Sequence, residues 1–310
     1  MYDKERKESF LLQTNMSKVF GKSVFNTTKQ REEELGKDLC EFTTGDLQPV
    51  MDTGFGSRTR TVSTAISFIR SYIRWCKEQG YPTNDGIDDV KINMGEKIKK
   101  GMVASPAHLE KILDKIFEPV SSGTLDCLYR CFLWMIYAGI KDIDAVEVKT
   151  SEIDFDLMTI EHNGKSYEIY REAVPAFKLA CTATQFRYIN PNYSEEKQGN
   201  FRNRFLGEYL LRGFRSPKIQ IKTMRAVTYK HFKEGGVETS YNKLRLSGLF
   251  YKVYEMERCG EPVNFDGYVV EEMAKEEHHY HTNYTRNKLA NTIKRDLEND
   301  YACWKEVFTK

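Results

Sequence analysis

The sequence lacks any apolar run of about 18 residues, the length that would cross a membrane as a helix. Its start, MYDKERKESF, carries charges where a secretory signal peptide has an apolar segment. We therefore expect a cytoplasmic protein with no membrane partner. Seven cysteines are scattered without a CxxC pair, a pattern that is typical of reduced core thiols and predicts neither a disulfide framework nor a zinc site.

The common motifs of nucleotide and serine chemistry are also missing. There is no glycine-rich phosphate loop of the Walker type and no G-x-S-x-G, so nucleotide hydrolysis and serine hydrolase activity are not supported, and no cofactor is expected. His278, His279 and His281 lie close together, but their spacing matches no familiar helical metal site. We interpret them as part of a solvated loop and expect no metal.

Charge of one sign is not in excess, because the formal net charge is only +2. A nucleic-acid surface must therefore come from local clustering. The segment 202–233 contains nine Lys or Arg residues and one acid, Glu208, with aromatic residues between them. It can be interpreted as a surface that follows a phosphate backbone, or as a solvated helical face, which is the commoner explanation of a run of charges.

Length and composition allow two domains, since 310 residues with 40% hydrophobic and 30% charged residues can form two cores. We expect an N-terminal arm or peripheral helix over residues 1–24 and a helical domain over 25–94. The polar stretch GEKIKKG predicts a linker over 95–104, and Ser105-Pro106 opens a second domain, 105–310.

Within the first domain, capping and periodicity predict helices from Thr27 or Thr28 through Leu39, from Thr44, and from Thr61 to Gly80. The last of these has an apolar stripe along one side. Arg70, Arg74 and Lys77 share its opposite face.

The clearest local pattern spans residues 125–160. Apolar residues at helical spacing over 125–137 predict a buried helix that ends at Gly139, and a short helix restarts at Asp142. An alternating run over 153–160, a turn at 162–164 and a second strand over 166–170 predict a β-hairpin, with a further helix from Ala176. The fold class is therefore mainly α with a small antiparallel β-sheet.

This order of buried helix, AGIK, short helix, IDFDLMTI and hairpin resembles the start of the catalytic domain of tyrosine recombinases, the phage integrase family. The preceding helices, TTKQREEELGKDLCEFTTGDLQPVM and TRTVSTAISFIRSYIRWCKEQGY, are similar to the core-binding domain of that family. The resemblance implies a two-domain architecture in which a helical core-binding domain and a catalytic-like domain hold a DNA duplex between them.

The resemblance also assigns roles to individual residues. The family arginine that grips the scissile phosphate corresponds to Lys141, and the lysine of the hairpin turn corresponds to Lys165. In SYNKLRLSG, Asn242 stands at the family histidine and Arg245 at the second arginine. In MAKEEHHYHTNY, Lys275 stands at the last histidine, and Tyr284, nine residues later, stands at the nucleophile.

Lys141, Asn242 and Lys275 thus depart from the family pattern, while each can still contact a phosphate. The resemblance implies a vestigial site without expected catalytic activity, in a sequence-specific double-stranded DNA-binding protein similar to the lysogeny repressors of SP-beta-type prophages. We expect these residues to contact DNA: Arg70, Arg74, Lys77, Lys141, Lys165, Lys222, Arg225, Lys230, Lys243 and Arg245.

Two other interpretations stay open. The chain could be an active site-specific tyrosine recombinase, or a protein-interaction module without a DNA function, although the latter leaves the basic segment unexplained. By the same resemblance, the C-terminal helix LANTIKRDLENDY could dock on a neighbouring protomer and support self-association.

Overall fold

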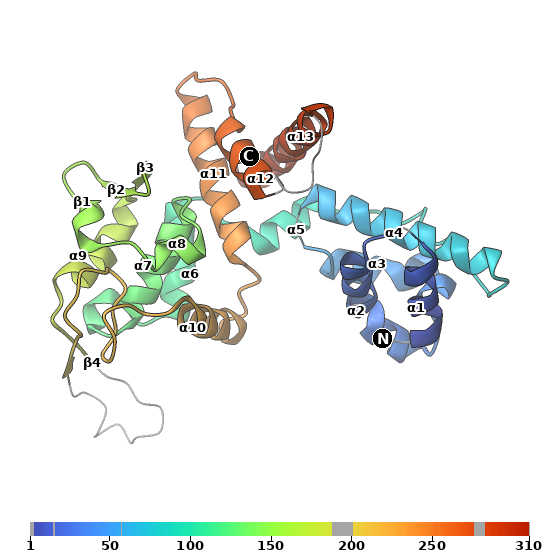
Figure 1. The fold of residues 1–310 in the computed structure, drawn as a ribbon, viewed down its shortest axis with the longest axis horizontal. Helices are drawn as coiled ribbons and strands as arrows, with labels where there is room; N and C mark the ends of the chain where they lie inside the picture. Colours follow the sequence, from blue (N-terminus) through green and yellow to red (C-terminus); the bar gives the residue numbers. More distant parts are fainter. Residues whose placement is uncertain (1–2, 15, 57, 188–200, 276–282, 310) are drawn as a thin grey trace. The chain divides into compact units, whose positions relative to one another are not determined.

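The computed structural model describes residues 3–14, 16–56, 58–187, 201–275 and 283–309, except for the side chains of residues 275 and 283–285. The chain divides into two compact units, one comprising Met1–Lys99 and Phe265–Lys310, the other Lys100–Asn264. Helices dominate both, and two small antiparallel sheets occur in the second (Figure 1). The predicted fold class, mainly α with a small antiparallel sheet, is confirmed. No helix in the described part of the chain is long and apolar enough to span a bilayer.

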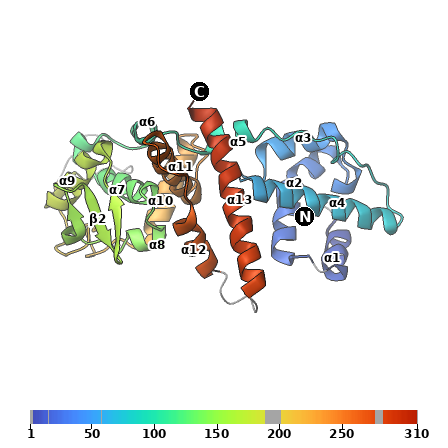
Figure 2. The ribbon, with the colours of Figure 1, turned by 90° about the horizontal axis from the view of Figure 1, so that it is seen from above.

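Over the residues that the structure describes, the regular structure of the first unit is helical. Its N-terminal part contains α1 (Lys4–Gln13), α2 (Lys18–Leu35), the 3₁₀ turn η1 (Leu39–Glu41), α3 (Thr44–Thr53) and α4 (Thr59–Glu78). Its C-terminal part contains α12 (Asp266–Lys275) and α13 (Asn283–Phe308), which pack side by side (Figure 2). The apolar stripe of α4 forms the centre of the core, with Phe68, Ile69 and Tyr72 buried among side chains of the helices around it.

Two details of this unit differ from the sequence expectations. The helix expected from Thr27 or Thr28 through Leu39 is α2, which begins at Lys18, because Ser17 accepts a hydrogen bond from the Phe20 N–H and caps it there. Gly36, with a φ of 65°, ends it before Leu39. Residues 1–24, expected to be an arm or peripheral helix, contain α1, whose Phe10 is fully buried.

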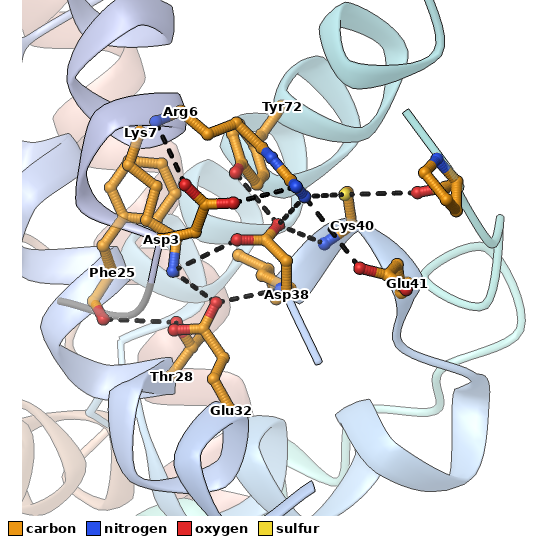
Figure 3. A network of polar contacts seen from close by, with 12 residues as sticks. Asp3, Arg6, Lys7, Phe25, Thr28, Glu32, Asp38, Cys40, Glu41 and Tyr72 are labelled. Carbon is orange, nitrogen blue, oxygen red and sulfur yellow. Dashed lines mark hydrogen bonds and ion pairs between the residues drawn. The ribbon is translucent and has the colours of Figure 1, made fainter. Parts of the chain in front are cut away.

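A network of buried charges holds α1 onto this core (Figure 3). Lys7 donates to Glu32, and both side chains are fully buried. Glu32 also accepts from the backbone N–H of Leu39 at 2.9 Å, and Lys7 Nζ lies 3.6 Å from Oδ2 of Asp38. Burial raises the pKa of Glu32, and the neighbouring Lys7 opposes that rise. The network joins α1, α2 and η1 through ion pairs that are buried away from solvent.

The N-terminus of α4 is capped from the far end of the chain. Arg58, its N-cap residue, makes no side-chain cap. Instead, Oδ1 of the buried Asp300 in α13 accepts from the backbone N–H of Thr59 at 2.9 Å and from its hydroxyl at 2.6 Å. Asp300 therefore acts as the missing cap and joins α13 to α4. Phe265–Lys310 belongs to this unit, whereas the sequence prediction assigns it to the domain 105–310.

The second unit is built around α7 (Asp126–Tyr137), which is buried along nearly its whole length. It packs between α9 (Val174–Thr182) and α11 (Tyr241–Arg258) (Figure 1). Around this core lie α6 (Pro106–Ile116), η2 (Val120–Ser122), α8 (Asp142–Ala145), η3 (Thr150–Glu152), η4 (Arg171–Ala173) and α10 (Ile221–Glu234). The division between the two units falls within α5 (Met94–Gly101). The segment 95–104, expected as a linker, is thus largely helical.

The larger sheet has the order β1 (Ile153–Asp154), β2 (Thr159–His162), β3 (Lys165–Glu168), with both pairings antiparallel. The expectation of one strand over 153–160 is wrong. Asp154 accepts hydrogen bonds from the N–H groups of Asp156 and Leu157 and so turns the chain, which leaves Leu157 exposed. A second antiparallel pair joins β4 (Gln185–Arg187) to β5 (Phe201–Asn203).

Candidate nucleic-acid interface

Lys141 stands between α7 and α8, at the turn that follows the buried helix. Gly139 has a φ of 114°, a conformation that disfavours any other residue, and ends α7 as the sequence predicts. The Lys141 carbonyl accepts from the N–H groups of Asp144 and Ala145, at 3.0 and 2.8 Å, and starts α8. The Lys141 side chain is half-buried.

Lys165 is the first residue of β3, directly after a two-residue turn. Asn163 and Gly164 both have positive φ, 50° and 71°, and His162 pairs with Lys165, which is the geometry of a type I′ hairpin. The side chain of Lys165 is exposed. A Cβ added to Gly139 would lie 3.7 Å from the ring of Tyr167, which belongs to the same strand as Lys165. The hairpin therefore lies against the turn that carries Lys141.

Helix α11 carries the other two matched residues of this unit. Ser240 caps it by accepting from the Lys243 N–H. Asn242, in its first turn, is exposed, whereas Arg245 is only 5% exposed. A Cβ on Gly248 would collide with the carbonyl oxygen of Tyr137, so the glycine permits α11 to pack closely against the end of α7, near Lys141.

The remaining predicted contact on α11, Lys243, is partly covered. Its Nζ donates to the Glu238 carbonyl at 3.2 Å, and burial lowers the pKa of Lys243. It is therefore held in place by the chain segment that precedes α11.

Asp142, the residue after Lys141, forms an ion pair with α10, and α10 in turn contacts α11. The sequence did not predict this relationship. Arg225 of α10 binds the Asp142 carboxylate, with Nη2 2.6 Å from Oδ2. Tyr229 stacks on Tyr241 with 4.8 Å between ring centroids, and burial, followed by the negative charge of Asp142, raises the pKa of Tyr229. Burial raises the pKa of Tyr241 as well. Both phenols therefore remain protonated at neutral pH. The only feature of the sequence that could have indicated the ion pair is the acidic residue next to Lys141.

The basic segment 202–233 has two structural roles. Lys222, Arg225 and Lys230 are exposed on α10, where Lys230 forms only a loose ion pair with Glu234, at 3.7 Å. Arg204, by contrast, is buried and donates to the backbone carbonyls of Ala180, Leu210 and Arg212. Burial lowers the pKa of Arg204 to about 10. One arginine of the basic segment thus serves the core, whereas α10 carries several of the exposed cations of the segment.

In the first unit, α4 exposes Arg70, Arg74 and Lys77 on the face opposite its buried stripe, as predicted. Arg70 Nε lies 2.6 Å from Asp88 Oδ1, and Lys77 lies 3.9 Å from Asp85. Arg74 makes no ion pair with any residue that the structure describes.

The other two matched positions belong to the first unit. Lys275 is the last residue of α12 and Tyr284 the second of α13, and their side chains lie outside the described residues. Lys141, Lys165, Asn242 and Arg245 thus belong to one unit, and Lys275 and Tyr284 belong to the other. His278, His279 and His281 also lie outside the described residues.

Residues 1–78 match the family model of the MrpR N-terminal core-binding domain. This match covers α1 to α4 and ends where α4 ends. It includes the exposed basic face of α4 and the buried network around Lys7. No curated protein matches the chain.

Solved structures with some likeness to the chain include two integrases and a recombinase. A lambda integrase dimer bound to a COC′ core site is 11% identical, covers 92% of this chain and 93% of its own, and has a TM-score of 0.37. The Tn1549 transposon integrase in complex with circular intermediate DNA is 10% identical over 91% and 96%, with a TM-score of 0.36. XerA recombinase is 12% identical over 90% and 98%, with a TM-score of 0.33.

Proposed function

We propose that the protein binds double-stranded DNA in a sequence-specific manner and acts as a transcriptional repressor of the phage or prophage type, using a tyrosine recombinase architecture without cleaving DNA. The observation that carries this proposal is the match of residues 1–78 to a core-binding domain family. A domain of that description has DNA as its natural ligand, and in this chain it presents a row of exposed cations on α4.

Cations on both units support a contact with the phosphate backbone. Arg70, Arg74 and Lys77 are exposed on α4, and Lys222 and Lys230 are exposed on α10. Long flexible side chains with charged ends bind phosphates by releasing condensed counterions. The same residues carry no sequence information by themselves, so recognition of a particular operator requires further contacts with base edges.

Lys141 and Asn242 support binding without cleavage. Lysine is a point charge and lacks the planar fork with which arginine holds two phosphate oxygens. Asn242 can donate a hydrogen bond but cannot take up a proton. Losing one donor aimed at a transition state costs about 3 kcal/mol, so these two changes together with Lys275 would leave little turnover.

An active recombinase is the second candidate, because Lys165 follows the hairpin turn and Arg245 keeps the family arginine in α11. The two candidates share DNA binding and differ in covalent chemistry. Trapping of a protein–DNA adduct separates them, whereas the binding assay tests what they share.

The binding test begins with selection of genomic fragments by the full-length protein, followed by footprinting of the enriched site. Affinity for that site should fall steeply with salt, with a log–log slope of magnitude roughly 5 or more, because two units that hold a duplex neutralise several phosphates. Replacing Lys222, Arg225 and Lys230 with alanine should flatten the slope by about 2 to 3.

The matched control replaces three other exposed lysines of the same unit, Lys111, Lys115 and Lys178, with alanine. It changes the net charge equally and should leave the slope close to that of the unchanged protein. Equal flattening by both triple variants would mean that α10 is only a solvated face. Failure to enrich any DNA would argue against both candidates and favour a protein-interaction module.

A further inference from the structure

Two cysteines from different elements of the first unit lie next to each other in its core. Cys40 belongs to η1 and Cys76 to α4, and neither is exposed to solvent. Their sulfur atoms and a carboxylate oxygen of Asp38 all lie within 4.8 Å of one another. The sulfurs are thus close enough for a change of side-chain rotamer to bring them into bonding contact.

The surroundings of Cys40 are polar (Figure 3). Nη1 of Arg6, on α1, lies 3.6 Å from Cys40 Sγ and 3.6 Å from Asp38 Oδ1. The Tyr72 hydroxyl donates to the same Asp38 oxygen at 2.9 Å. A buried cysteine ordinarily packs as a small apolar group, whereas a guanidinium, a carboxylate and a phenol surround this one.

The two thiols are not equivalent. Cys40 has one proton and can donate it either to the carbonyl of Pro82, 3.4 Å away, or to Cys76. The bond from Cys40 lowers the pKa of Cys76, with further help from Tyr72 and Arg6, while the same bond and burial raise the pKa of Cys40. Cys76 is therefore the thiol that ionises first and Cys40 the one that stays protonated beside it.

Other cysteines of the described chain lack this arrangement. Cys127 and Cys131 lie one turn apart on α7, and burial raises the pKa of Cys127 to about 12 and that of Cys131 well above its usual value. Cys259 is exposed. Cys181 on α9 and the cation of Arg204 also lie close enough to influence the pKa of Cys131. Among the described cysteines, only Cys40 and Cys76 belong to a group of three possible ligand atoms that all lie within 4.8 Å of one another.

A disulfide fits these groups better than a metal ion does. Asp38, Cys40 and Cys76 could supply three ligands, one fewer than a closed zinc site. Arg6 and Lys7, however, each have a nitrogen 3.6 Å from the Asp38 carboxylate. These two cations already balance the charge that would attract a metal, and they oppose a third cation at the same place.

We propose that Cys40 and Cys76 form a reversible intramolecular disulfide when the protein meets a low-molecular-weight disulfide such as oxidised glutathione. The Cys76 thiolate attacks one glutathione sulfur and releases one glutathione thiolate. Cys40 then loses its proton and attacks Cys76 Sγ in the mixed disulfide, releasing the second glutathione. Two protein thiols are oxidised, one glutathione disulfide is reduced to two thiols, and the two protons pass to them.

Burial sets the rate of this reaction. Arg6 lies over Cys40, so the reagent reaches the pair when α1 moves away from the core, and the reaction is slower than at the exposed Cys259. The bond links η1 to α4 across a loop of more than thirty residues, which constrains the unfolded chain and raises the thermal midpoint.

The test incubates the full-length protein with oxidised glutathione, quenches it with acid, alkylates free thiols and maps the peptides by mass spectrometry without reduction. The expected product is one peptide pair linked through Cys40 and Cys76. Dithiothreitol should remove it and reverse an upward shift of the thermal midpoint. Cys259→Ser, the matched control, should keep the linked pair and lose only a glutathione adduct.

The proposal would be overturned if Cys40 and Cys76 remained free thiols after Cys259 had been completely modified. A stable glutathione adduct on Cys40 or Cys76 alone would also overturn it. A parallel incubation with zinc alone tests the metal. The site would be assigned to a metal instead if the unchanged protein bound one equivalent of zinc and Cys76→Ser bound none, and if oxidation gave no linked peptide. The decisive measurement uses the unchanged protein and no DNA, so it depends neither on the folding of a variant nor on the proposed function.

Discussion

Arg225 donates from Nε and Nη2 to one carboxylate oxygen of Asp142, at 2.8 and 2.6 Å. Asp142 directly follows Lys141 in the sequence. Its carboxylate is paired with Arg225, one of the cations that we expect to bind a DNA phosphate. The pair is partly exposed, with 47% of the Arg225 side chain and 20% of the Asp142 side chain accessible. Exposed pairs contribute about 0 to 1 kcal/mol, little enough for a DNA phosphate to displace the carboxylate.

Asp142→Asn should therefore tighten DNA binding. The substitution removes a negative charge beside the proposed phosphate contact and leaves Arg225 without a competing carboxylate. We expect a three- to fivefold lower Kd, equivalent to about 1 kcal/mol or less. Fluorescence anisotropy with the footprinted site measures it.

Glu255→Gln is the matched control, because it removes an equivalent charge from the exposed pair of Glu255 and Arg258, at 3.0 Å in the same unit. It should leave the Kd nearly unchanged. The same tightening in both variants would show a general effect of net charge, and no tightening in Asp142→Asn would show that Arg225 does not contact DNA.

The buried pair of Lys7 and Glu32 should make the first unit sensitive to the loss of either partner. Lys7→Met leaves a carboxylate buried without its cation and should lower the free energy of unfolding by about 3 to 5 kcal/mol. Replacing both residues, Lys7→Met with Glu32→Leu, should recover most of that loss, because an apolar pair of similar volume needs no ion partner. Urea unfolding followed by circular dichroism measures both, and a double variant no more stable than Lys7→Met would contradict this account.

The Asp300 cap should link the C-terminal helix to the stability of the first unit. Asp300→Ala removes the acceptor of both Thr59 hydrogen bonds and should cost about 1 kcal/mol, the usual value of an N-cap. Asp300→Asn keeps an acceptor oxygen and should cost less. Similar losses in both variants would mean that the charge of Asp300, and not its hydrogen bonds, holds α13 to α4.

The pH dependence of stability gives a separate test of Asp300. Burial raises the pKa of Asp300 in the folded protein. A raised carboxylate pKa means that the folded state binds a proton more tightly than the unfolded state, so the contribution of Asp300 is most favourable below its unfolded pKa and is lost as the pH rises through the folded value. Asp300→Asn should remove that part of the pH dependence, and an unchanged profile would contradict the burial of the charge.

The sequence predicted local structure well where one short signal decides it. Asn163-Gly164 sets the hairpin register, and the apolar helix before Gly139 becomes α7. The expectation of one strand over 153–160 was wrong, because Asp154 forms a turn within the run of alternating apolar residues.

Relationships between distant residues could not be predicted in this way. Asp300 and Thr59 are 241 positions apart, and nothing in either neighbourhood signals a shared cap. Lys7 lies in a charged N-terminal segment, where a lysine is ordinarily expected in solvent, so its burial depends on a partner in α2 that local patterning does not reveal. The Asp142–Arg225 pair was missed for the same reason, since α8 and α10 meet only in the folded chain.

The central claim, binding of DNA without cleavage, is tested most directly by a nicked duplex that carries the footprinted site. In such a substrate a cleaved strand diffuses away, and any phosphotyrosine adduct remains on a denaturing gel. With Lys141, Asn242 and Lys275 in place of the groups that activate the phosphate, we predict no adduct. Tyr284→Phe should change the binding free energy by no more than one hydrogen bond, about 1 kcal/mol. An adduct that forms with the unchanged protein and disappears in Tyr284→Phe would contradict the proposed function and identify an active recombinase.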